Sequence, residues 1–107
     1  MAVFLITRDY RRETEQETLP VVVEFFASWC PKCSMMKDVV ENLARRLEGK
    51  ILFKKADIDQ LKDTAGYLGV EIVPTFIVYK NGEIMGYTTG VLPGPVLGRR
   101  ITDMLNV

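Results

Sequence analysis

The chain has 107 residues, a length that predicts a single domain over residues 1–107. Its 14 basic and 14 acidic residues give a formal net charge of zero, which argues against a nucleic-acid-binding protein. The sequence contains no histidine, so it excludes histidine-based acid–base catalysis and metal sites that need imidazole ligands.

The N-terminal segment begins with a short apolar run at residues 2–6, which predicts a strand. Charged residues follow at once, so the segment lacks the order of a secretory signal. No later stretch approaches the roughly 18 apolar residues of a membrane span. We therefore expect a soluble cytoplasmic protein that starts at its own Met1. Residues 8–18 have only a weak apolar stripe and predict at most a short helix.

Residues 21–26 form an almost continuous run of β-branched and aromatic side chains, broken only by Glu24. Such a run predicts a central strand that is buried on both faces. From Pro31 the apolar spacing changes to a helical period, which ends at a glycine in the position of a C-terminal cap. The residues that carry this period are Met36, Val40, Leu43 and Leu47, with Gly49 as the cap.

The second half of the chain continues the alternation of strands and helices. We predict a strand at 51–58, a short helix at 61–68, strands at 75–79 and 83–87, and a last helix carrying Leu97, Ile101, Met104 and Leu105. Asn81-Gly82 predicts a tight hairpin between the last two strands. The order of elements indicates an α/β protein with a parallel core, helices on both faces and an antiparallel edge.

The two cysteines, Cys30 and Cys33, are the candidates for chemistry. A disulfide across two residues stabilises a fold poorly, because the entropic gain grows with loop size. Cys30 falls between the central strand and the long helix, where free backbone N–H groups stabilise an anion. Cys33 lies one turn further on. This spacing favours an attacking thiolate followed by a resolving thiol.

A metal-binding pair is the competing interpretation, and it belongs to a different class of protein. Zinc usually takes four ligands, and this chain offers one cysteine pair and no histidine. A closed site would therefore need two chains that share a metal or iron–sulfur centre through Cys30 and Cys33. The strand before the pair and the helix after it favour redox chemistry instead.

Residues 22–33, which read Val-Val-Glu-Phe-Phe-Ala-Ser-Trp-Cys-Pro-Lys-Cys, resemble the active-site stretch of the thioredoxin family. The similarity continues through residues 55–59, Val73-Pro74-Thr75, residues 80–83 and Gly90, in the same order. It implies a thioredoxin fold, with a mixed five-stranded sheet in the order 1-3-2-4-5 and four flanking helices. It also implies a protein-disulfide reductase that needs no bound cofactor or metal.

The resemblance also implies roles for single residues and for partners. Cys30 would attack the substrate disulfide, and Cys33 would resolve the mixed disulfide. Pro74 would be a cis-proline facing the pair, and Val73 would offer its backbone to an extended substrate. The expected docking residues are Trp29, Val73, Pro74 and Gly90. A thioredoxin reductase drawing on NADPH, or a similar donor, would reduce the pair again, and we expect a monomer without nucleic-acid or membrane partners.

Glu24 is the expected acid–base residue. Its neighbours on the same face of the predicted strand are apolar, so the carboxyl should be buried and its pKa raised by desolvation. The family usually has an aspartate here, to which proton exchange with the resolving cysteine is assigned, and disulfide isomerases have a glutamate. Lys55 matches the lysine near that acid, where it would tune the acidity of the carboxyl or simply balance its charge.

The Pro31-Lys32 dipeptide between the cysteines departs from the Gly-Pro of typical thioredoxins. Proline after the first cysteine also occurs in glutaredoxins and in strongly oxidising thiol oxidases. Lys32 should favour the charged form of the thiolate, which makes the pair more oxidising. We therefore expect a reduction potential above the thioredoxin value of about −270 mV. The alternative within redox chemistry is a glutaredoxin-like or isomerase-like enzyme coupled to glutathione.

Overall fold

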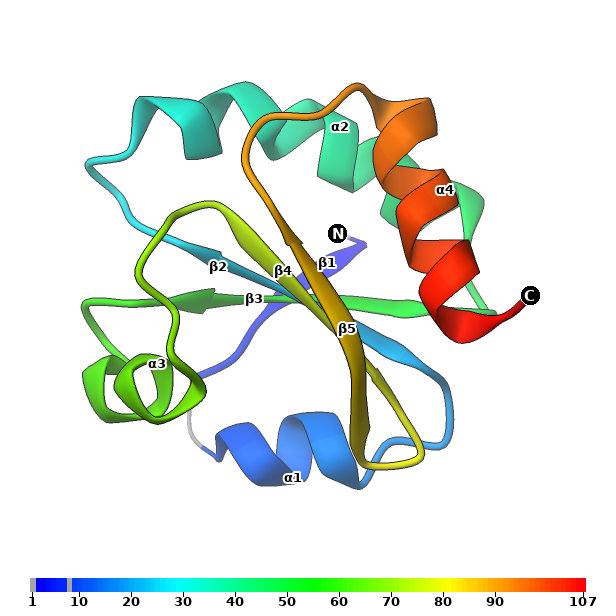
Figure 1. The fold of residues 1–107 in the computed structure, drawn as a ribbon, viewed down its shortest axis with the longest axis horizontal. Helices are drawn as coiled ribbons and strands as arrows, with labels where there is room; N and C mark the ends of the chain where they lie inside the picture. The colour runs from blue at the N-terminus through cyan, green and yellow to red at the C-terminus, as the bar shows by residue number, and fades with distance from the viewer. Residues whose placement is uncertain (1, 8) are drawn as a thin grey trace.

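The sheet has five strands in the order β1-β3-β2-β4-β5, with helices on both of its faces (Figure 1). This computed structural model describes residues 2–7 and 9–107. The elements are β1 (Val3–Leu5), α1 (Tyr10–Glu15), β2 (Val21–Phe26), α2 (Pro31–Arg46), β3 (Leu52–Asp57), α3 (Lys62–Leu68), β4 (Thr75–Lys80), β5 (Glu83–Thr89) and α4 (Gly94–Leu105). Both the α/β class and the strand order implied by the resemblance are confirmed.

Every predicted strand and helix is present, and the differences lie at element ends. Helix α1 begins only at Tyr10, because Asp9 caps it by accepting a hydrogen bond from the backbone N–H of Arg12. Strand β5 runs to Thr89, beyond the predicted end, since it stays paired with β4 up to that residue. The expectations that fell on Met1 and Arg8 lie outside the described residues.

Strand β2 occupies the centre of the sheet because its side chains are apolar on both faces. It pairs in parallel with β3 and antiparallel with β4. Val22 packs into the cluster formed with α2 and α4, whereas Val23 and Phe25 pack into the cluster formed with α1 and α3. Figure 1 shows these two pairs of helices on opposite sides of the sheet. After the carboxyl end of β2 at Phe26, a short connection leads into α2, which begins at Pro31.

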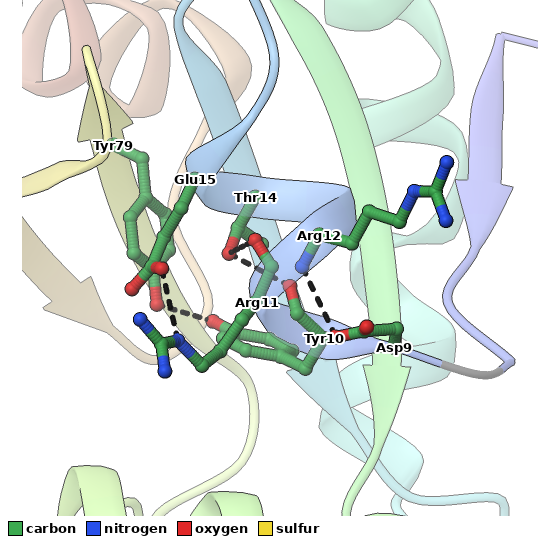
Figure 2. Close-up of polar contacts among 7 residues, drawn as sticks. All are labelled: Asp9, Tyr10, Arg11, Arg12, Thr14, Glu15 and Tyr79. Carbon is green, nitrogen blue, oxygen red and sulfur yellow. Dashed lines mark hydrogen bonds and ion pairs between the residues drawn. The ribbon is translucent and has the colours of Figure 1, made fainter.

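Helix α1 is held on the sheet by a buried pair of tyrosine hydroxyls (Figure 2). The hydroxyl oxygens of Tyr10 and Tyr79 lie 2.5 Å apart, and the two rings meet edge to face. Burial raises the pKa of both phenols, and most strongly that of Tyr10. The Arg11–Glu15 ion pair lies on the exposed side of the helix, where such pairs contribute little. The tyrosine pair therefore anchors this short helix.

Replacing either tyrosine alone with phenylalanine is expected to lower the free energy of unfolding by about 1–3 kcal/mol, because the remaining hydroxyl loses its buried partner. The double variant Tyr10→Phe/Tyr79→Phe should lose less than the sum of the two single changes, since both polar groups are then gone. Urea denaturation of the four proteins as a double-mutant cycle measures this coupling. Strictly additive losses would contradict a shared hydrogen bond.

Candidate functional site

Cys30 and Cys33 lie where β2 gives way to α2. The Cys30 sulfur caps the helix by accepting a hydrogen bond from the backbone N–H of Cys33 at 3.2 Å. The two Sγ atoms are 2.6 Å apart, and both side chains are buried. Pro31 occupies the first turn, where its missing N–H is no loss. One sulfur therefore sits at the positive end of α2, next to its exchange partner.

The loop before β4 faces the cysteine pair. The Val73–Pro74 peptide bond is cis, as the resemblance implied. The Cys30 thiol donates to the Val73 carbonyl oxygen across 3.7 Å. Gly90 follows β5 and donates its N–H to the Pro74 carbonyl oxygen at 2.9 Å; its φ of 92° is a conformation that favours glycine. The chain thus brings Val73, Pro74 and Gly90 together beside Cys30.

Trp29 is a surface residue, with 64% of its area exposed. Its indole Nε1 donates a hydrogen bond to Asp59 Oδ2 at 2.9 Å, and the backbone N–H of Asp59 donates to Asp57 Oδ1. The ring is therefore held next to the cysteines without being part of the core. Sequence reasoning did not identify Asp59 as the partner of Trp29, because nothing in the local pattern links residues 30 positions apart.

Glu24 is buried in β2, with only 6% of its area exposed. Removal from water raises its pKa to about 7, and the positive charge of Lys55 opposes part of that rise. Lys55 stands directly across from Glu24 in the parallel pairing of β2 with β3, and its Nζ lies 5.4 Å from the centroid of the Phe26 ring. The carboxyl can therefore gain or lose a proton near neutral pH.

A cavity of about 470 Å³ has both Glu24 and Cys33 in its wall. Burial, a hydrogen bond with Cys30 and the nearby carboxylate of Glu24 together raise the pKa of the Cys33 thiol to about 12. Cys33 thus keeps its proton at neutral pH and needs a base before it can attack. The charged side chains of Lys37, Asp38, Glu41 and Lys55 also line this cavity.

Lys32 is exposed in the first turn of α2, between the two buried cysteines. The other predicted site residues lie around the cysteine pair or in the wall of the adjoining cavity. Across residues 2–7 and 9–107, no group of three or more His, Cys, Asp or Glu side chains is placed to hold a metal ion. The arrangement is suited to dithiol–disulfide exchange within one chain.

Comparison with known proteins decides the family, because the thioredoxin family model matches residues 2–103. The chain belongs to the thioredoxin family. A thioredoxin of Chlorobaculum thiosulfatiphilum is 31% identical over 96 residues, covering 90% of this chain and 89% of the relative. The chloroplastic thioredoxin M4 of Arabidopsis thaliana is 34% identical over 97 residues, covering 91% of this chain and 50% of the relative.

A solved structure extends the similarity to three dimensions. It comes from work on the thiol-resolving mechanism of a yeast mitochondrial 1-Cys peroxiredoxin through the glutathione and thioredoxin systems. Superposed on this chain, that structure gives a TM-score of 0.84 at 27% sequence identity, and the match covers 94% of each chain. The likeness therefore spans the fold and is not confined to the active-site stretch.

Membership of the thioredoxin family makes this chain a protein-disulfide oxidoreductase, with disulfide substrates and a reductase as its general partners. The relatives do not favour the glutaredoxin-like, isomerase-like or metal-sharing alternatives. In the part of the chain that the structure describes, no helix is both long and apolar enough to cross a membrane.

Proposed function

We propose that this thioredoxin-family protein reduces protein disulfides by cycling between a Cys30/Cys33 dithiol and the corresponding disulfide. One observation carries the proposal: the Cys30 sulfur at the start of α2 lies 2.6 Å from the Cys33 sulfur and faces the carbonyl of Val73. A nucleophile, a resolving thiol and a place for the substrate backbone thus come from one chain. We therefore also propose that the protein acts as a monomer.

In the first step, the Cys30 thiolate attacks one sulfur of the substrate disulfide. The substrate S–S bond breaks, a mixed disulfide forms with Cys30, and the other substrate sulfur leaves as a thiolate that takes up a proton. The N-terminus of α2 stabilises the negative charge on Cys30 before the attack. Lys32 adds a positive charge in the same turn of the helix.

The substrate is proposed to lie as an extended segment over the loop that faces Cys30. The Val73 backbone supplies hydrogen-bonding groups within reach of that segment. Pro74 offers no N–H, and it follows Val73 through a cis peptide bond. Exposed Trp29 and the backbone of Gly90 form the two sides of this docking surface.

In the second step, Cys33 attacks Cys30 and releases the reduced substrate. Glu24 in its carboxylate form first takes the proton of the Cys33 thiol through water in the cavity that both residues line. The new Cys30–Cys33 bond expels the substrate sulfur as a thiolate, which is then protonated. In total, two electrons and two protons pass from the dithiol to the substrate. The proton of Cys30 passes through the solvent when its thiolate forms, and the proton of Cys33 passes through Glu24.

The cycle closes when a reductase returns two electrons to the Cys30–Cys33 disulfide. We propose a thioredoxin reductase drawing on NADPH, or a similar donor, for this step. We propose the cytoplasm as the compartment, because its reducing conditions keep the cysteine pair in the dithiol form that donates electrons to substrates. Lys55 takes part only indirectly, because its charge lowers the pKa of Glu24.

The reduction potential of the cysteine pair tests the proposal, with Trp29 fluorescence as the reporter in glutathione buffers. We expect one reversible two-electron transition between about −270 and −220 mV, and none in the Cys30→Ser variant. A potential near −120 mV, where strong oxidants of this fold lie, would contradict a reductant and favour the glutathione-coupled alternative. The absence of any reversible transition in the unaltered protein would contradict the dithiol cycle itself.

A further inference from the structure

A second cavity, of about 360 Å³, lies between the segment that follows α3 and the edge strand β5. Its apolar wall comes from Leu68, Val70, Ile72, Ile77, Ile84 and Tyr87, and we call it the β5 groove. Ile77 belongs to the hydrophobic cluster on the α1 and α3 side of the sheet. Figure 1 shows β5 at the edge of the sheet nearest the viewer. The groove is separate from the cavity beside Cys33.

The β5 groove leaves large apolar side chains in contact with water. Ile72 is 59% exposed, Ile84 is 51% exposed and Tyr87 is 68% exposed. Single exposed apolar residues are ordinary on protein surfaces, but these three line one groove. Glu71 is the one charged residue among the described residues that line it. This surface matches a peptide that carries apolar or aromatic side chains together with a basic one.

The groove adjoins the loop that faces Cys30. Ile72 and Thr75 line the groove, flank Val73–Pro74 and are joined by a hydrogen bond from Thr75 Oγ1 to the Ile72 carbonyl oxygen. The Val73 carbonyl oxygen lies 3.7 Å from the Cys30 sulfur. An extended chain advances about 3.3 Å per residue, so a substrate joined to Cys30 reaches the groove within a few residues.

The edge of β5 argues against a second copy of this chain as the occupant. Val78 pairs with Gly86 and Tyr79 pairs with Ile84, so Met85 is an extra residue that forms a bulge. Bulges at sheet edges disfavour edge-to-edge pairing of strands. A partner is therefore expected to contact the side chains of the groove and not to pair with the backbone of β5 as an added strand.

We propose that the β5 groove is a secondary docking site for protein substrates. It would take a segment next to the attacked disulfide that carries apolar or aromatic side chains and a lysine or arginine opposite Glu71. This inference rests on the proposed function, because the groove selects among disulfides that Cys30 then attacks. The flanking sequence of a substrate thus contributes to specificity without altering the exchange chemistry.

Disulfide-closed peptides test the groove. One bare peptide is compared with two extended forms that carry a Phe-Ile-Lys tail on the N-terminal or the C-terminal side of the disulfide. For the unaltered protein, we expect at least one tail to raise kcat/KM about tenfold over the bare peptide, a difference of about 1.4 kcal/mol. The variant Ile84→Thr/Tyr87→Thr should bring that ratio close to one. Phe4→Thr, at a 52% exposed residue of the opposite edge strand β1, should keep the original ratio.

A charge exchange gives a second test that does not disturb the apolar wall. Glu71 is exposed, so Glu71→Lys should not affect folding. We expect this variant to prefer a Phe-Ile-Glu tail over the Phe-Ile-Lys tail, the reverse of the unaltered protein. An unchanged preference for the lysine tail would overturn the assignment of Glu71 as the charge that faces the substrate.

The remaining outcomes separate this inference from the proposed function. If the bare peptide is reduced but neither tail raises kcat/KM, the docking site is wrong and the proposed function stands. If no peptide is reduced at all, the proposed function fails. Sedimentation showing a dimer that Ile84→Thr/Tyr87→Thr converts to a monomer would identify a second copy as the occupant and overturn the substrate assignment.

Discussion

With serine in place of Cys33, the protein is expected to stop after its first step and to accumulate as a mixed disulfide with its substrate. Serine fills nearly the same space as cysteine, but its hydroxyl does not attack a disulfide. Cys30 keeps its place at the start of α2 and still reacts. Turnover of protein disulfides should fall by at least about a thousandfold, because the resolving step is lost. Non-reducing electrophoresis and mass spectrometry measure the accumulated adduct.

The matched control is Cys30→Ser, which should lose turnover to the same extent but form no adduct. Adding a small dithiol should release the trapped substrate from the Cys33→Ser protein and show that the link is a disulfide. If Cys30→Ser were the variant that accumulates the adduct, the order of attack proposed for the two cysteines would be wrong. The two thiols differ in setting, since burial and the contact with Cys30 raise the pKa of Cys33.

The cysteine pair could be located from the sequence because the pattern changes there from a buried strand to a helical period. This change alone places Cys30 at a helix N-terminus, as the structure shows. The burial of Glu24 could likewise be predicted, since its same-face neighbours in one strand are apolar. Both conclusions depend on local periodicity, which is the strongest structural signal in a single sequence.

Contacts between distant segments could not be predicted in this way. The hydrogen bond from Trp29 to Asp59 and the buried pair of Tyr10 and Tyr79 depend on how strands are ordered in the sheet. The cis bond before Pro74 came only from the family resemblance, because most X–Pro bonds in folded proteins are trans. The β5 groove had no local signal either, as its wall combines residues from three separate segments.

Replacing Glu24 with glutamine is expected to slow the release of substrate by about a hundredfold at pH 8, in the range that general base catalysis contributes. The pKa of Glu24 is raised to about 7, so its carboxylate base becomes available as the pH rises through that value. In the unaltered protein, the release rate should therefore rise between about pH 6 and pH 8. The glutamine variant should lack this rise, and stopped-flow Trp29 fluorescence in single-turnover reactions measures it.

The same substitution should increase stability above pH 7. Burial raises the pKa of Glu24 from 4.5 to about 7. Between these two pH values, the folded protein therefore holds a proton on Glu24 that the unfolded chain has already lost. The stabilisation from this protonation is complete below pH 4.5 and is lost as the pH rises through 7. Glutamine cannot ionise, so above pH 7 the free energy of unfolding of Glu24→Gln should exceed that of the unaltered protein by up to about 3 kcal/mol. Urea titrations at several pH values measure this difference.

Glu24→Asp is the matched control, since it keeps a carboxyl at the same position. It should retain a pH-dependent release rate, whereas a merely structural glutamate would allow glutamine to substitute for it in the release step. A slower release together with a higher stability in Glu24→Gln is the signature of a buried base. Both effects have one cause, because desolvation destabilises the carboxylate of Glu24 and thereby raises its pKa to about 7, near neutral pH. Equal pH profiles for Glu24→Gln and the unaltered protein would assign the base to another group.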